Sequence, residues 1–324
     1  MGLGLFYWKI RMKKTIHLLV NKVSGSNRGN RQYNLLKQEL EKRNIPFTSA
    51  ISSFSGDLVS LTTDLVNKIG DSFRDNTIIV IGGDGSLNQA VNGLKKSNFP
   101  NTPLAYLPSG TGNDFARAVK LPHTIEELLD HLSHPTIIKV DCGFYQDSFN
   151  HESAYFVNNL GIGFDAYVVA LSNHSHLKDR LNKWHLGNLT YGLHILKVLK
   201  NQPTFSVTVK ANGKSHYFKK AYLVTTTNHP FFGGGVPILP QAKITSHSLD
   251  TVVVEKISAL SFIRLFTKLL INGSHVKDSH FHYFESSKID VDVSSAQYGQ
   301  LDGEELGKHP DHITFNIDSF NLLT

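Results

Sequence analysis

Two glycine-rich stretches decide the fold of this chain: Gly82-Gly83-Asp84-Gly85-Ser86 and Ser109-Gly110-Thr111-Gly112-Asn113-Asp114-Phe115. Each follows an apolar run typical of a buried strand, residues 77–81 and 104–107, and each precedes a helical pattern. A strand that ends in glycines at a helix N-terminus presents free backbone N–H groups and the positive end of a helix dipole, which together hold phosphate. The two stretches therefore predict the two sides of one nucleotide site.

The sequence around these loops alternates strand and helix patterns. Strands are expected over 15–21, 47–51, 77–81 and 104–107, a polar loop over 24–26, and helices over 34–44, 58–69 and after each glycine loop. Such alternation implies a mainly parallel sheet whose ligands bind beyond the carboxyl ends of the strands. We therefore expect a three-layer α/β nucleotide-binding domain over 12–135. Residues 1–11 read as an upstream extension or tail, or alternatively as an interfacial anchor.

After residue 135 the rhythm changes, and strand-like runs follow one another closely. They cover 137–144, 155–160, 205–209, 217–226, 251–257, 281–284, 289–293 and 313–317. Turn pairs such as Asn212-Gly213 and Asp302-Gly303 separate many of them, and two helical patterns interrupt them over 188–200 and 258–271. We expect an antiparallel, β-sandwich-like domain over 136–324, whose last strand could return to the first domain.

Composition sets wide bounds. The 324 residues include 33 Lys+Arg and 27 Asp+Glu, and the resulting charge of +6 suits anionic partners or simply keeps the protein soluble. The single cysteine, Cys142, excludes an internal disulfide and favours a reducing cytoplasm. The sequence has no apolar run near the length that spans a bilayer.

The loop residues have chemical roles that suit a phosphate site. Gly82 and Gly83 let the backbone approach phosphate oxygens, and Ser86 could cap the following helix. Asp84 beside a polyphosphate needs Mg²⁺ or a proton, or else it fixes the turn by bonding backbone amides. In the second loop Thr111 offers a hydroxyl, and Asn113 or Asp114 could cap the next helix. That capping is the entire role of these two residues stays open as an alternative.

With these motifs in place, the sequence resembles the diacylglycerol kinase catalytic-domain family of lipid kinases, in particular its soluble bacterial members. That family also includes sphingosine and ceramide kinases. The resemblance lies in residues 21–25, 82–88, 108–117 and 301–304, and in Gly233-Gly234-Gly235 followed by Pro240 and Ala242.

The resemblance implies ATP- and Mg²⁺-dependent phosphorylation of a lipid hydroxyl, above all that of diacylglycerol, giving phosphatidic acid. The reaction would take place in a cleft between the α/β domain and the β-sandwich-like domain. The implied nucleotide contacts are Asn21, Ser24, Gly25, Ser53, Gly82, Gly83, Asp84, Gly85, Ser86, Asn88, Gly110, Thr111, Gly112 and Asn113.

The resemblance also assigns catalytic carboxylates to Asp302-Gly303-Glu304. A lipid hydroxyl is a poor nucleophile, so a carboxylate must take its proton as it attacks the γ-phosphate. We favour Glu304 as that base, with Asp302 orienting it or Mg²⁺, and Asp84 on the metal side. Asp302 or Asp84 as the base stays open, and so does a plain hairpin turn at Asp302-Gly303.

Two positions depart from the family pattern. In Ser246-His247-Ser248-Leu249-Asp250 the family usually has Asp-Gly, where a structural Mg²⁺ binds; an imidazole is a poor ligand for that ion, and Asp250 lies one residue off. Gln89 stands where Glu is common. The histidines at 174, 176, 185 and 194 form no metal motif, and the apolar pattern over 191–199 predicts core packing or one wall of a lipid pocket.

We therefore expect a soluble lipid kinase that is cytoplasmic and peripheral at the inner face of the cell membrane. It would act on a lipid at the membrane surface and have no nucleic-acid partner, and an exposed sheet edge could support a homodimer. Two alternatives stay open. One is a small-molecule kinase related to NAD kinase or phosphofructokinase, which share a Gly-Gly-Asp-Gly loop. The other is a nucleotide-binding regulatory protein without transfer activity.

Overall fold

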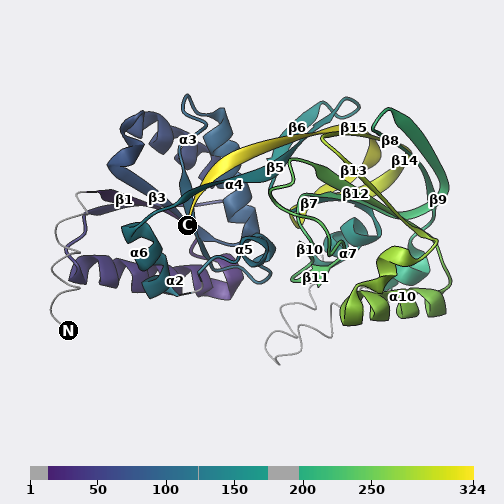
Figure 1. Cartoon of the computed structure of the whole chain (residues 1–324), viewed down its shortest axis with the longest axis horizontal. Helices are drawn as coiled ribbons and strands as arrows, with labels where there is room; N and C mark the ends of the chain where they lie inside the picture. Colours follow the sequence, from purple (N-terminus) through teal and green to yellow (C-terminus); the bar gives the residue numbers. More distant parts are fainter. Residues whose placement is uncertain (1–13, 123, 174–196) are drawn as a thin grey trace. The chain divides into compact units, whose positions relative to one another are not determined.

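The computed structural model describes residues 14–122, 124–173 and 197–324 (Figure 1). They form two compact units, the first containing the residues up to Cys142 together with Ser319–Thr324, and the second Gly143–Asp318. The units divide inside a strand, at residues 142 and 143, whereas the sequence pattern placed the boundary near residue 135. The predicted tail over 1–11 lies outside the described residues.

The first unit is a three-layer α/β structure built on parallel strands. Their order is β4-β3-β1-β2, and the end of β15 pairs in parallel with β4 through Leu322 and Leu104. The strands are β1 (Thr15–Val20), β2 (Phe47–Ile51), β3 (Asn76–Gly82) and β4 (Leu104–Pro108). The helices are α2 (Ser24–Lys42), α3 (Asp57–Ile69), α4 (Asp84–Lys96), α5 (Asp114–Val119) and α6 (Ile125–Ser133), with a 3-10 turn over Ser72–Arg74.

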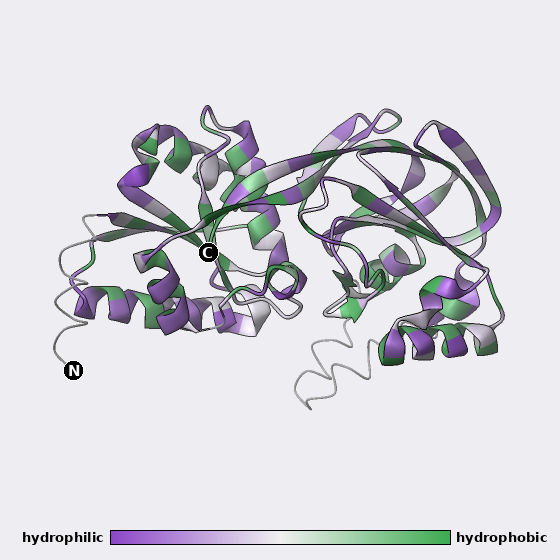
Figure 2. Cartoon of the chain, viewed as in Figure 1, coloured by the Kyte–Doolittle hydropathy of each residue, from purple (hydrophilic) through white to green (hydrophobic). Residues whose placement is uncertain are grey.

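Helices cover both faces of this sheet. Leu36 and Leu40 of α2 and Leu129 of α6 share one buried cluster with Ile79 of β3. On the other side α3 and α4 pack tightly, because Gly93 has no side chain to separate its backbone from that of Val59. Strands covered on both faces read as continuous apolar runs, as residues 77–81 do (Figure 2).

The second unit is antiparallel. Its strands are β5 (Ile137–Asp147), which begins in the first unit, β6 (Glu152–Phe156), β7 (Asn159–Gly163), β8 (Phe205–Ala211), β9 (Lys214–Thr227), β10 (Phe231–Phe232), β11 (Val236–Pro237), β12 (Leu249–Glu255), β13 (Phe281–Ser286), β14 (Lys288–Leu301) and β15 (Glu304–Leu323), which ends in the first unit. Its helices are α7 (Phe164–Asn173) and α10 (Ala259–Asn272), with a 3-10 turn over Ser274–Lys277.

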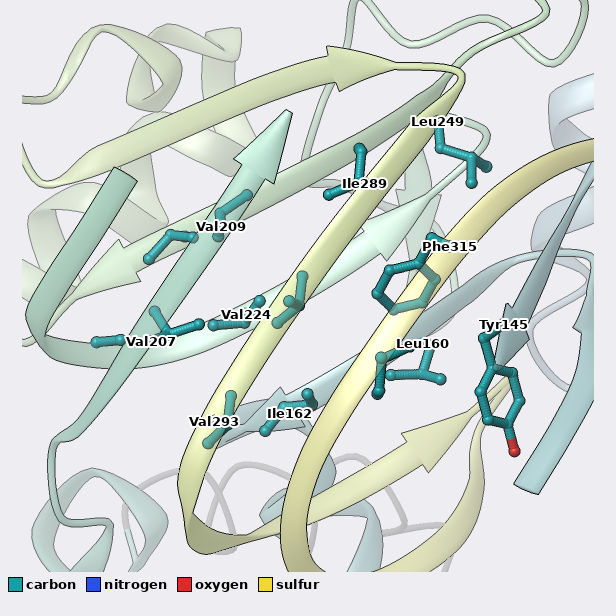
Figure 3. Close-up of a cluster of buried hydrophobic side chains, with 14 of the residues drawn as sticks. Tyr145, Leu160, Ile162, Val207, Val209, Val224, Leu249, Ile289, Val293 and Phe315 are labelled. Carbon is teal, nitrogen blue, oxygen red and sulfur yellow. The ribbon is translucent and has the colours of Figure 1, made fainter. Parts of the chain in front are cut away.

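Four strands of this unit pair in a closed ring. The long strands β9 and β14 each pair with β8 near one end and with β7 near the other. The ring encloses apolar side chains, among them Val207, Val224, Ile289 and Val293 (Figure 3). This packing is the core of the β-sandwich-like domain that the sequence predicts.

The structure corrects two local predictions. Residues 155–160 form two strands rather than one, because the backbone between β6 and β7 turns away to donate hydrogen bonds to Asp302. The expected loop over 24–26 is counted in α2, although Gly25, Ser26 and Asn27 have positive φ and interrupt that helix. Among the described residues no helix is long and apolar enough to cross a membrane.

Candidate functional site

The first glycine loop joins β3 to α4. Gly83 is the last non-helical residue, with an extended backbone, and α4 begins at Asp84, so Gly85 and Ser86 lie within its first turn. Ser86 therefore does not cap the helix as predicted. Its buried hydroxyl instead accepts a hydrogen bond of 3.1 Å from Asn21 Nδ2, which ties the first loop to the end of β1.

The two glycine loops touch each other. A Cβ built on Gly110 would lie 2.6 Å from the Cα of Gly83, and one built on Gly83 would lie 3.1 Å from the Cα of Gly110. Real side chains do not tolerate the shorter separation, so a glycine is required at position 110. This contact explains why both loops are rich in glycine.

Asp84 links the same two loops through its carboxylate. Its oxygens accept hydrogen bonds from the backbone amides of Asp114 at 3.0 Å and Phe115 at 3.4 Å, the first residues of α5. Asp84 thus caps the helix that follows the second loop, a favourable position for a carboxylate. The prediction that Asn113 or Asp114 caps this helix is wrong. Asn113, the residue before α5, makes no side-chain cap hydrogen bond, and Asp114 is already the first residue of the helix. Asn113 instead accepts from Gly110 N at 2.8 Å.

A third loop, residues 21–25, lies against the second. Ser24 Oγ is 2.9 Å from Ser109 Oγ, and a Cβ on Gly25 would lie 2.1 Å from the carbonyl oxygen of Ser109. Asn21 Oδ1 is buried, and among the described residues it has no hydrogen-bond partner. A buried acceptor without a partner is costly, so this position favours a ligand or water that donates to it.

The remaining predicted nucleotide contacts surround these loops less closely. Thr111 is exposed, and Thr111, Gly112 and Asn113 line an open pocket of about 660 Å³ whose other residues include the basic Arg117 and Lys120. Asn88 Oδ1 accepts from Asn92 Nδ2 at 3.2 Å. Ser53 is exposed at the end of the edge strand β2, and its amide donates to Asp57 Oδ2 at 2.7 Å.

In the second unit Asp302 and Gly303 form the turn between β14 and β15, with φ of 48° and 88°. The Asp302 carboxylate accepts hydrogen bonds from the amides of Val157, Asn158 and Asn159 at 2.8–2.9 Å. The turn is thus a hairpin, and Asp302 also holds the segment between β6 and β7. Glu304 is exposed at the first position of β15.

A buried polar network supports this turn, and the sequence motifs gave no sign of it. Gln300 Oε1 accepts from Gly303 N at 2.9 Å, while Gln300 Nε2 donates to Asn159 Oδ1 at 2.5 Å and to Asp165 Oδ2 at 3.1 Å. Burial raises the pKa of Asp165 to about 6. The only available signal was the unusual run of polar residues, such as Asn158-Asn159, between apolar strands.

His229 extends the network on the side of β9. Its Nε2 lies 2.8 Å from Asn158 Oδ1, and Thr227 Oγ1 donates to the carbonyl of Asn158 at 3.0 Å. Burial lowers the pKa of His229 to about 3, so the imidazole is neutral at physiological pH. Its ring nitrogens support the network through hydrogen bonds to Asn158 and from the amide of Phe231.

Carboxylates lie close together in the region around His247, which departs from the family pattern. His247 adopts a left-handed backbone with φ of 57°, and Asp250 of β12 lies opposite Glu285 of β13. Burial, with the Glu285 charge adding to it, raises the pKa of Asp250 to about 7. Glu285 accepts from Ser248 Oγ at 2.8 Å. Two carboxylates and a hydroxyl lie here, and His247 adds no oxygen side chain to them.

An apolar pocket lies beside α10 in the second unit. It encloses about 70 Å³ and is lined by aromatic and aliphatic side chains and one histidine: Phe164, Tyr222, Leu223, Phe232, Ile238, Val254, Phe262, Leu265, Phe266, Leu269, His275 and Phe281. Of the predicted pattern over 191–199, the described Val198 is buried in the same cluster. The rest of that pattern up to residue 196, and the four histidines at 174–194, lie outside the described residues.

Comparison with known proteins identifies both halves of the chain. Residues 15–145 match the family model of the diacylglycerol kinase catalytic domain. Residues 158–324 match that of the YegS C-terminal NAD kinase beta sandwich-like domain.

Relatives of similar length match along most of this chain. A Bacillus subtilis strain 168 protein named "Putative lipid kinase YtlR" is 28% identical over 94% of this chain and 98% of its own. The diacylglycerol kinase of the same strain is 27% identical, with 92% of each chain covered. The crystal structure of a diacylglycerol kinase from Bacillus anthracis has the same fold, with a TM-score of 0.64 and 18% identity over 96% of each chain.

Proposed function

This chain belongs to the diacylglycerol kinase catalytic-domain family of lipid kinases, and on that premise we propose that it transfers the γ-phosphate of ATP to the hydroxyl of diacylglycerol, giving phosphatidic acid. The observation that carries the proposal is the convergence of three loops in the first unit. Residues 21–25, 82–86 and 109–113 contact one another through glycines and hydroxyls, and Asn21 Oδ1 is buried there without a hydrogen-bond partner among the described residues.

These loops fit a nucleotide. Gly83 and Gly110 leave no side chain between the two backbones, and Arg117 and Lys120 line the pocket beside the second loop. ATP held here would supply the phosphoryl group, and Mg²⁺ would neutralise its charge as it transfers. Asn21 Oδ1 would accept a hydrogen bond from a donor group of the nucleotide or from water, and Thr111 would offer its exposed hydroxyl.

Glu304 is the proposed general base. Its side chain is exposed, so its carboxylate can accept the proton of the lipid hydroxyl while the oxygen bonds to phosphorus. Asp302 and Asp84 suit this role less well, because each already accepts hydrogen bonds from backbone amides. We propose that both act as positioning residues, Asp302 for the turn that carries Glu304 and Asp84 for the two glycine loops.

The apolar pocket beside α10 supports a lipid acceptor. A water-soluble acceptor would need convergent polar groups, whereas this pocket is lined almost entirely by apolar side chains. Because the enclosed space is about 70 Å³, an acyl chain would have to extend beyond it. The substrate would be taken from the membrane surface.

The test is ADP release with ATP, Mg²⁺ and mixed micelles that contain diacylglycerol. The wild-type protein should release ADP only when the lipid is present, and Glu304→Gln should reduce turnover by about 100-fold or more, the range of general-base contributions. The neighbouring Glu305→Gln is the matched control and should keep most of the activity.

Three outcomes would contradict the proposal in different ways. Turnover on NAD or a sugar phosphate without lipid would favour the small-molecule kinase. Tight ATP binding with no transfer to any lipid in a total extract would favour a regulatory protein. Equal activity of Glu304→Gln and wild type would leave the lipid kinase in place and reject Glu304 as the base.

A further inference from the structure

We infer that the second unit contains a binding site for a divalent transition-metal ion of the Zn²⁺ type, formed by Asp147, His309 and Asp311. One potential ligand atom from each of these side chains lies within 4.8 Å of the other two. Asp147 is the last residue of β5, and the other two belong to β15. The site is separate from the loops and the turn of the proposed kinase reaction.

The buried carboxylate of Asp311 points to a ligand, whereas that of Asp147 already accepts hydrogen bonds from the amides of Phe149 and His312 and from Asn150 Nδ2. Asp147 and Asp311 are each only 4% exposed, and Asp311 Oδ2 has no hydrogen-bond partner among the described residues. A buried carboxylate oxygen without a partner is costly unless a positive charge satisfies it. The other oxygen of Asp311 lies 3.0 Å from His309 Nδ1.

His309 is oriented as metal-binding histidines are. Its Nε2 lies 3.1 Å from the carbonyl oxygen of Leu306, which can accept only if this nitrogen carries hydrogen. In the neutral ring that bond leaves a lone pair on Nδ1, which lies 3.0 Å from Asp311 Oδ1 and 3.2 Å from the carbonyl oxygen of Pro310. Oxygen acceptors therefore face a nitrogen lone pair there, so a proton or a metal ion must lie between them.

Asn150 shows where additional ligands are. Its Nδ2 is hydrogen-bonded to Asp147 Oδ2 and lies 2.8 Å from His309 Nδ1 and 3.1 Å from the carbonyl of Pro310. Three acceptors therefore converge on an amide nitrogen that has two hydrogens. A cation that took this place would be bound by the same acceptors, and a rotated Asn150 would add its carbonyl oxygen.

The donor set selects the ion class. Imidazole nitrogen together with carboxylate oxygen suits Zn²⁺, whereas Mg²⁺ prefers oxygen ligands alone. Zn²⁺ bonds are about 2.0–2.2 Å long, so the side chains would have to close in slightly. The bound ion would fasten the turn between β5 and β6 to β15.

The experiment is equilibrium dialysis of the full chain against Zn²⁺, followed by metal analysis. The chain has 17 histidines, so unspecific binding must be subtracted with variants. Wild type should hold one tight equivalent, and His309→Gln and Asp311→Asn should each weaken it by at least about tenfold. His282→Gln is the matched control, because His282 and Glu255 form an imidazole–carboxylate pair at 3.2 Å in the same unit.

Thermal unfolding gives a second measurement if Asp311→Asn folds poorly. Zn²⁺ should raise the Tm of wild type and of His282→Gln but not that of His309→Gln, since an ion that binds only the folded state stabilises it. Mg²⁺ at the same concentration should not reproduce the shift. Equal Zn²⁺ binding by all variants, or a shift retained in His309→Gln, would reduce the cluster to a His309–Asp311 ion pair and overturn the inference.

Discussion

At Gly110 the two glycine loops leave room for hydrogen only. We expect Gly110→Ala to lower the free energy of unfolding by about 1–3 kcal/mol, as overpacking does, and to weaken ATP binding, because the new methyl group pushes the first loop away. Gly83→Ala should have the smaller effect, since its Cβ would meet the neighbouring Cα at 3.1 Å instead of 2.6 Å. Urea unfolding and nucleotide titration of both variants measure which substitution has the larger effect. A larger effect of Gly83→Ala would contradict the contact.

Asp165 predicts a pH dependence of stability. Burial raises its pKa to about 6 in the folded protein, above the usual value near 4. Between these values the folded state holds a proton that the unfolded state has lost, so this residue's contribution to stability falls as pH rises from about 4 to about 6. It stays low at higher pH, where the buried carboxylate is charged.

Asp165→Asn should remove that contribution to the pH dependence. Urea unfolding at pH 4.5 and pH 7.5 should show that the variant gains stability relative to wild type at the higher pH. An identical change in both proteins between the two pH values would mean that Asp165 is ionised throughout. The neutral amide can still accept from Gln300, so the network around the turn should survive.

At the scale of elements, α5 depends on a cap from another loop. Asp84→Asn should lower the free energy of unfolding by about 1 kcal/mol, because an amide loses the favourable interaction of a charge with the helix N-terminus. Asp71→Asn is a suitable control, since Asp71 is exposed and makes no side-chain cap bond at its 3-10 turn. Urea unfolding of both variants tests this, and equal small losses would argue against the cap.

The sequence predicted the elements of the first unit well, because parallel strands buried on both faces are continuous apolar runs. The runs over residues 77–81 and 104–107 lie within β3 and β4, whose residues are almost all buried. Prediction failed where a side chain far away in the sequence determines the backbone conformation. Asp302 breaks the segment between β6 and β7, and Asp84 replaces the local cap of α5. The local sequence pattern around β6, β7 and α5 does not reveal either of these distant carboxylates.

The parts of the candidate site differ in how far the sequence predicts them. Among the glycines that were predicted to approach phosphate, Gly83 and Gly110 lie in close contact across the two loops, and their approach to phosphate stays a prediction. The support beneath Asp302, which involves Gln300, Asn159 and Asp165, could not be predicted because it joins strands far apart in the sequence. The catalytic role of Glu304 stays a prediction.

At the scale of the whole molecule, the first unit includes residues from the far end of the sequence. Phe320 is buried and stacks on Phe115 of α5 with ring centroids 5.9 Å apart, and Leu322 pairs with β4. Phe320→Ala should therefore cost about 3–5 kcal/mol and act on the first unit. Thermal unfolding with and without ATP should show that the first unit of the variant melts at a lower temperature than that of wild type. A variant that melts like wild type would contradict this dependence.

The return of residues 319–324 also has a consequence for synthesis of the protein. The loops that would hold ATP are translated early, but the strand that completes their sheet follows only after the entire second unit. A chain interrupted anywhere in between would lack Phe320 beneath α5 and the backbone bonds between Thr324 and Thr136. Incomplete copies should thus be poor ATP binders and ready targets for proteases, so the cell would be spared fragments that bind ATP without a lipid to phosphorylate.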